Sequence, residues 1–151
     1  MRLIQRFGPR TLEREWGEEI IIAETPQYLG KLLKMRAGTQ GGLQAHRIKE
    51  ETFFLASGRA IVVHDDGQGR LLETPMGPGE SYHIPPGAVH QVKACLDCVF
   101  IETSTPVYED RVRCEELYGL RADSGLPTTY VETSVDDASS SQSESTKSVE
   151  D

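Results

Sequence analysis

The sequence predicts an all-β protein, built as a sandwich or a small barrel. Short apolar segments recur about every 8–12 residues, and about eight of them can be recognised. Glycine, proline and aspartate fill the gaps between them, as in Asp65-Asp66-Gly67-Gln68-Gly69 and Pro85-Pro86-Gly87. The expected strands are residues 20–23, 28–35, 52–56, 60–63, 70–73, 81–84, 89–93 and 99–103.

Each expected strand ends at a turn signal. The Ile-Ile-Ile-Ala run at 20–23 is closed by Thr25-Pro26, and the segment 28–35 stops before Gly38. Gly58 separates the next two strands, and the Met-Gly-Pro-Gly turn at 76–79 precedes the strand 81–84. After the last strand, the chain passes a proline, and one short helix is expected over about 110–117.

The charge of the chain is concentrated at its end. The net charge is −8, but residues 132–151 hold six acids against one base, which leaves −3 for residues 1–131. A nucleic-acid-binding protein would need clustered positive charge, so nucleic acid is not expected as a partner. An anionic small molecule needs only two or three well-placed Arg or Lys side chains, and that class of ligand stays open.

We expect one domain with two flanking segments. Residues 1–16 are expected to be an N-terminal arm, 17–119 the barrel domain, and 120–151 a linker and a disordered, acidic, serine-rich tail. No apolar run reaches the roughly 20 residues of a membrane span, and no secretory signal is visible. Three cysteines do not make a disulfide framework. The expectation is a cytoplasmic protein without a membrane partner.

Four side chains form the candidate metal site: Gln44, His46, Glu51 and His90. Gln44 and His46 are two residues apart, so on a strand they point to the same face. Glu51 comes five residues after His46, and this odd separation requires a turn within the polar segment 47–50 if both are to converge. His90 belongs to a later strand, after the rigid Pro-Pro-Gly corner. One amide, two imidazoles and one carboxylate suit zinc, iron, manganese or nickel.

The spacing of these residues resembles the two motifs of the cupin superfamily. Gly38-x5-Gln44-x-His46-x4-Glu51-x6-Gly58 is similar to the first motif, with Gln in place of its first His, and Gly79-x5-Pro85-x-Gly87-x2-His90 is similar to the second. Gln91 and Leu120 stand where the phosphomannose isomerase (type II mannose-6-phosphate isomerase-like) branch commonly has arginine. Segments that nevertheless resemble this branch are Trp16-Gly17, Ser104-Thr105-Pro106, Glu109-Asp110-Arg111-Val112-Arg113 and Tyr118-Gly119.

The resemblance implies a single-domain cupin β-barrel of the jelly-roll type, with a short C-terminal helix. It implies that Gln44, His46, Glu51 and His90 hold a divalent ion, zinc before manganese, iron or nickel. The implied activity is aldose–ketose isomerisation of a sugar or sugar phosphate, in a homodimer. The ion would polarise the substrate carbonyl while a nearby base moves a proton between C1 and C2.

Further polar residues near the motifs are candidates for contact with the substrate. Lys49 and Glu80 are the expected catalytic residues, because each lies close in sequence to a predicted ligand or motif. Two other function classes stay open: a non-haem iron dioxygenase, which would contain iron and consume oxygen, and a non-catalytic sugar-binding cupin, which would bind without turnover. The expected substrate-binding residues are Arg36, Arg59, Tyr82 and Arg113.

Overall fold

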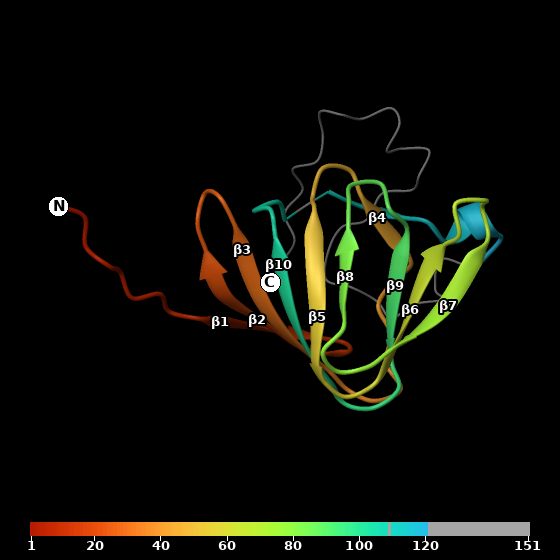
Figure 1. Cartoon of the computed structure of the whole chain (residues 1–151), viewed down its shortest axis with the longest axis horizontal. Helices are drawn as coiled ribbons and strands as arrows, with labels where there is room; N and C mark the ends of the chain where they lie inside the picture. Colours follow the sequence, from red (N-terminus) through yellow and green to blue (C-terminus); the bar gives the residue numbers. More distant parts are fainter. Residues whose placement is uncertain (109, 121–151) are drawn as a thin grey trace.

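The computed structural model describes residues 1–108 and 110–120, and the regular secondary structure within them is almost entirely β. Residues 1–9 form no strand and extend away from the rest of the chain (Figure 1). The strands are β1 (Arg10–Arg14), β2 (Gly17–Glu24), β3 (Leu29–Met35), β4 (Gln44–His46), β5 (Glu51–Ser57), β6 (Ala60–Asp65), β7 (Leu71–Met76), β8 (Ser81–Ile84), β9 (His90–Ala94), β10 (Cys98–Ser104) and β11 (Arg111–Arg113), followed by the 3-10 helix η1 (Glu115–Tyr118).

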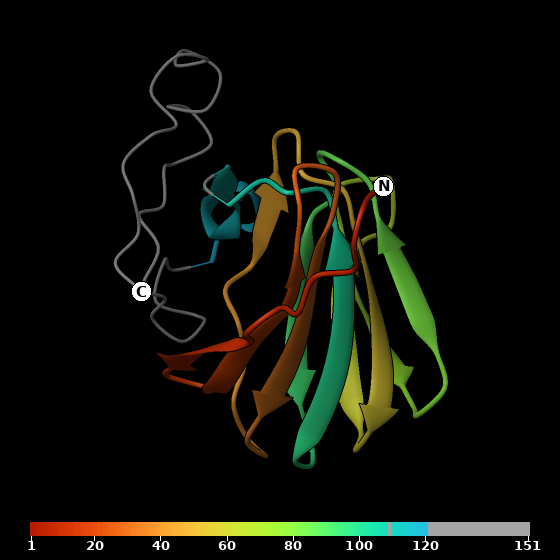
Figure 2. The same cartoon turned by 90° about the vertical axis from the view of Figure 1, so that its left-hand side faces the viewer.

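The strands form two antiparallel sheets that face each other. The first sheet has the order β1-β2-β3-β10-β5-β8, and the second has the order β11-β4-β9-β6-β7. Figures 1 and 2 show the two sheets with the interior of the barrel between them. The predicted all-β barrel is therefore confirmed, and side chains from β4, β5 and β9 can meet between the sheets.

The core follows from the alternation of apolar residues along the strands. On β10, the residues Cys98, Phe100, Glu102 and Ser104 are buried, while the residues between them are less buried or exposed. Such a period of two places alternate side chains on opposite faces of a sheet. The main cluster of buried apolar side chains contains Met35, Phe53, Leu55, Ala60, Val62, Met76, Ile84, Ala94, Cys98 and Phe100.

The C- and N-terminal segments differ from the sequence-based expectation at two points. The helix expected over 110–117 is wrong in its first half, because Arg111–Arg113 pair with β4 as strand β11, and only Glu115–Tyr118 are helical. The expected N-terminal arm contains strand β1, which pairs with β2. The expected tail, apart from Leu120, lies outside the described residues. Among the described residues, no helix is long and apolar enough to span a membrane.

Gly58, the last residue of the first motif, is required by the turn between β5 and β6. Its φ of 101° lies in the region that residues with a side chain rarely adopt. A Cβ at this position would also collide with the backbone of Asp97 and with Cys98. The motif glycine is thus explained by a backbone conformation and by a close approach of two turns.

Candidate metal centre

Three strands from the two facing sheets bring the predicted metal ligands together. Gln44 and His46 lie on β4, Glu51 is the first residue of β5, and His90 is the first residue of β9. Gln44 is paired directly with His90 across β4 and β9. The chain passes between residues 47 and 50 from one sheet to the other, so Glu51 faces back toward His46. The turn that the odd spacing required is therefore present.

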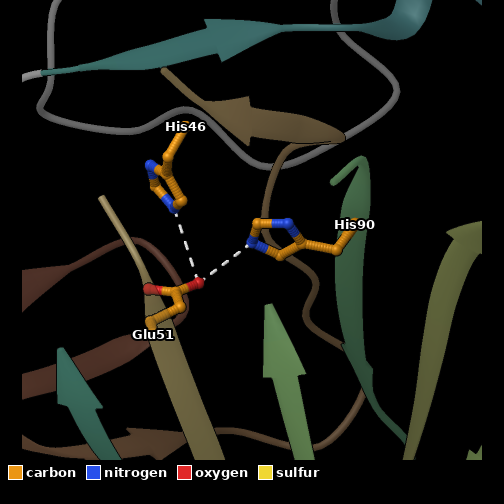
Figure 3. A group of neighbouring side chains, drawn as sticks. All are labelled: His46, Glu51 and His90. Atoms are coloured by element: carbon orange, nitrogen blue, oxygen red, sulfur yellow. Dashed lines mark ion pairs between the residues drawn. The ribbon is translucent and has the colours of Figure 1, made fainter. Parts of the chain in front are cut away.

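His46, Glu51 and His90 form a compact buried group (Figure 3). One Glu51 carboxylate oxygen, Oε1, lies 3.4 Å from His46 Nε2 and 3.1 Å from His90 Nε2. One potential ligand atom from each residue lies within 4.8 Å of the others, and the three residues are only 3–6% exposed. Two imidazole nitrogens and a carboxylate oxygen at this spacing could hold a divalent ion.

The hydrogen bonding of the two imidazoles supports this interpretation. His90 Nδ1 lies 3.0 Å from the carbonyl oxygen of Ala88, which can only accept, so Nδ1 carries the proton. In the neutral ring, Nε2 then directs a lone pair toward the Glu51 carboxylate. Neither buried nitrogen of His46 makes a well-formed hydrogen bond to a described residue. Electron-rich atoms that face one another without a donor between them are the arrangement a bound cation would stabilise.

The electrostatics at His46 also favour positive charge. Burial of the ring lowers the pKa of His46, but the carboxylates of Asp110 and Glu51 outweigh this effect and raise it. The pKa of Glu51 is lowered in spite of its burial, because His46, His90 and Lys49 surround the carboxylate. Glu51 is therefore an anion at neutral pH, as a metal ligand must be.

Gln44 and Lys49 are placed at the edge of this group. The amide oxygen of Gln44 accepts a hydrogen bond of 3.0 Å from the guanidinium of Arg111. Lys49 Nζ lies 2.8 Å from Glu51 Oε2 and 3.3 Å from Glu102 Oε2. Burial alone would lower the pKa of Lys49, but the carboxylates of Glu102 and Glu51 raise it above its ordinary value. Lys49 is therefore a buried ammonium that holds its proton and donates hydrogen bonds.

The other predicted site residues lie away from the pocket that contains the three ligands. Glu80 is exposed in the turn between β7 and β8, where its carboxylate accepts a hydrogen bond from the backbone of Gly77. Arg36 and Arg59 are exposed, and Tyr82 stacks on Phe53 with ring centroids 5.9 Å apart. Arg113 pairs with the buried carboxylate of Glu115. None of these five residues lines the pocket.

Charged side chains that the sequence analysis did not select line the pocket instead. They come from β1, β2, β3, β10 and β11, and most are buried in ion pairs: Arg14, Glu19, Lys31, Glu102 and Arg111. Three of them could have been found from the alternation of side chains along a strand. Glu19, Lys31 and Glu102 each lie an even number of residues from buried apolar residues of the same strand, so they share the inward-facing side. The apolar part of the lining is Trp16, Leu33, Met35, Phe53, Val92 and Phe100.

The comparison with protein families identifies the fold around this site. The family model of the Cupin domain matches residues 31–103, which include all four predicted ligands. The fold around the pocket is cupin-like. No curated protein sequence matches the chain.

Solved structures have the same cupin fold at low sequence identity. A cupin described as RmlC-like, from Shewanella frigidimarina, is 19% identical, with a TM-score of 0.59 over 69% of this chain and 91% of the other. KdgF from Halomonas sp. is 20% identical, with a TM-score of 0.54 over 60% of this chain and 79% of KdgF. A cupin-superfamily sugar phosphate isomerase from Silicibacter pomeroyi is 19% identical, with a TM-score of 0.56 over 65% of each chain.

A similar fold also forms part of a longer protein. The capsular polysaccharide assembling protein CapF from Staphylococcus aureus is 18% identical, with a TM-score of 0.62 over 70% of this chain. The present chain covers 31% of CapF. At these identities, the likeness concerns the fold, and the function must be argued from the pocket.

Proposed function

We propose that this cupin is a metal-dependent isomerase that interconverts the aldose and ketose forms of a sugar phosphate. The observation that carries the proposal is the buried group of His46, Glu51 and His90 at the wall of a pocket lined by charged side chains. The names of two fold relatives, a sugar phosphate isomerase and the capsular polysaccharide protein CapF, are consistent with a sugar ligand.

The proposed metal ligands are His46, Glu51, His90 and Gln44. Zinc is the expected ion, and manganese, iron and nickel suit the same nitrogen and oxygen donors. When bound, such an ion supplies Lewis acidity to a carbonyl and an adjacent hydroxyl of the substrate. Gln44 would keep its hydrogen bond from Arg111, because an amide oxygen has two lone pairs.

Lys49 and Glu102 are the proposed proton-handling residues. Isomerisation moves one proton from C2 to C1 of the aldose and another between the two oxygens, so it needs no oxidant. Lys49, protonated between Glu51 and Glu102, would stabilise negative charge on a substrate oxygen. The Glu102 carboxylate, which lines the pocket, would carry the proton between the carbons. Glu80 has no part in this scheme.

Several cationic side chains of the pocket suit a phosphorylated substrate. Arg14, Lys31 and Arg111 line it in addition to Lys49. Arg and Lys donate several hydrogen bonds each and are the usual partners of phosphate in proteins. We therefore expect mannose 6-phosphate and related sugar phosphates to bind more tightly than the neutral sugars.

The first test is elemental analysis of the protein purified without added metal or chelating resin. We expect close to one divalent ion per chain, followed by conversion of mannose 6-phosphate to fructose 6-phosphate. In deuterated water, the product would carry deuterium from exchange of the transferred proton. Bound iron together with oxygen uptake would instead support the hypothesis that the protein is a non-haem iron dioxygenase. Bound metal and sugar binding without turnover would indicate a non-catalytic cupin.

Matched variants separate the proposed roles. His46→Ala and His90→Ala should lose both metal and turnover. Glu102→Gln should keep the metal and lose turnover, whereas Glu50→Gln, an exposed carboxylate next to the site in sequence, should change neither. Turnover that persists in metal-free His90→Ala would overturn the proposal. A cytoplasmic location and a homodimer stay predictions of the sequence.

A further inference from the structure

Strand β4 carries two of the four proposed metal ligands, yet it is only three residues long. Its pairing with β9 is limited to Gln44 and His90, whereas all three of its residues pair with β11. His46 stands opposite Arg111 in this register. The position of His46 therefore depends mainly on the C-terminal segment that begins at Asp110.

Asp110 joins that segment to His46 in two ways. Its Oδ2 accepts hydrogen bonds of 2.7 Å from the backbone N–H groups of both Ile48 and Lys49, so the carboxylate is fixed against the turn after β4. Its Oδ1 lies 3.3 Å from His46 Nδ1, a close charge contact whose geometry is not that of a well-formed hydrogen bond. The side chain is only 4% exposed, and its backbone carbonyl accepts from Arg47 N–H.

We propose that Asp110 is a positioning residue that selects the tautomer and orientation of His46 for metal binding. A carboxylate at Nδ1 can only accept, so it favours the ring with the proton on Nδ1 and the lone pair on Nε2. Nε2 is the atom that faces Glu51 and His90 (Figure 3). Ala88 selects the same tautomer of His90 through its carbonyl oxygen.

This inference rests on the proposed metal site and adds a residue to it that touches neither metal nor substrate. The two histidines are thus oriented by different means. His90 is oriented by the backbone carbonyl of Ala88, just before its own strand β9. His46 is oriented by the carboxylate of Asp110, which lies 64 residues later in the sequence. Docking of the segment that begins at Asp110 is then a condition for a complete metal centre.

Asp110→Asn is the informative variant, because it keeps the shape of the side chain and reverses one contact. The amide oxygen can still accept from Ile48 and Lys49, which leaves the NH2 group facing His46 Nδ1. Nδ1 must then accept, the ring proton moves to Nε2, and the metal-binding atom is blocked. We expect zinc affinity to fall about 10- to 100-fold, the range typical of lost partners of metal-bound histidines.

The control is Asp66→Asn. Asp66 also accepts two backbone N–H bonds, from Gln68 and Arg70, but it lies outside the pocket. Zinc affinity is measured by competition with a chromophoric chelator, and the ring tautomers by 15N NMR of the metal-free protein at a pH above the raised pKa of His46, where its ring is neutral. Asp110→Asn should move the 15N signals of His46 alone, and Asp66→Asn should change neither readout.

Three results would overturn the inference: unchanged zinc affinity in Asp110→Asn, weaker zinc binding with an unchanged His46 tautomer, or an equal loss in Asp66→Asn. If the wild-type protein binds no divalent metal, the proposed function fails by itself. The tautomer measurement in metal-free protein would still decide the orienting role of Asp110, so the two failures can be told apart.

Discussion

The interior of the barrel has two ends of opposite character, although the same strands build both. At the apolar end, Met35, Leu55, Cys98 and Phe100 pack together from β3, β5 and β10. At the charged end, the same strands and the same face present Lys31, Glu51 and Glu102. Cross-strand pairs show the change within one register: Phe100 faces Leu33, and two residues further on Glu102 faces Lys31.

The two ends of the interior differ in what they contribute: the apolar end to the stability of the fold, and the charged end to the proposed chemistry. Buried apolar side chains contribute to stability by leaving water, whereas buried charges cost free energy unless they are paired. A domain that keeps a row of ion pairs in its interior does not gain stability from them. Such a row is best explained by the ligand or ion that it serves, and the apolar end supplies the stability that allows it.

Phe100→Ala should produce the largest loss of stability. The ring is 1% exposed and packs edge-on against Phe53 at 5.9 Å between centroids. Its removal leaves a cavity, and we expect the free energy of unfolding to fall by about 3–5 kcal/mol in urea denaturation. Ile101→Ala, one residue along on the outer face, should cost about 1 kcal/mol or less. Similar losses in both variants would contradict the division into inner and outer faces.

Lys49→Met tests the charged end. The substitution leaves Glu51 and Glu102 buried without their shared cation, and we expect a loss of about 3 kcal/mol in the metal-free protein. Saturating zinc should recover part of this loss, because the ion would neutralise Glu51. Lys93→Met removes a half-exposed pair with Glu73 and should cost less than about 1 kcal/mol with or without zinc. A loss in Lys49→Met that zinc does not reduce would count against a cation at Glu51.

Much of the barrel could be predicted because its strands and turns are marked locally. Segments such as 60–63 and 81–84 lie between turns rich in glycine or proline, and the structure has strands there. Strand β1 carries no apolar alternation, since Arg-Thr-Leu-Glu-Arg has one apolar residue, and it exists because β2 offers it an edge. Strand β11 is only three residues long, so its pairing with β4 decides its conformation rather than any local pattern.

The part of the candidate site that could be predicted is the part whose residues recur at fixed spacing in the sequence motifs. His46, Glu51 and His90 stand in motif positions, and the fold brings them within contact of one another. Lys31 and Glu102 were not selected because a charged residue in a strand is usually read as solvent-facing. Only the three-dimensional pairing shows that each occupies an inner position. Asp110 lies far from His46 in sequence, and no local signal connects the two.

Gly58→Ala against Gly79→Ala would sharpen the account of the turns at the apolar end. Both glycines have positive φ, 101° and 89°, so alanine strains the backbone at either position. Only at Gly58 would the new Cβ also collide with the Asp97 backbone and Cys98, since nothing lies within 4 Å at Gly79. We expect losses of about 1–3 kcal/mol, larger for Gly58, in thermal unfolding. Equal losses would show that the strain in φ alone explains the motif glycine.

Lys31→Met should have the smallest effect of these substitutions. We expect it to lower the affinity for the ligand rather than the free energy of unfolding. Glu19 loses Lys31 as a partner but still accepts a hydrogen bond of 2.7 Å from Arg14, so its buried carboxylate stays paired. Removal of one cation from the lining should weaken mannose 6-phosphate about tenfold, equivalent to about 1.4 kcal/mol, and leave neutral mannose unchanged. Lys34→Met, on the outer face of the same strand, is the control. Calorimetric titration of both sugars distinguishes the cases, because an equal loss for mannose and its phosphate would mean that Lys31 shapes the pocket without recognising charge.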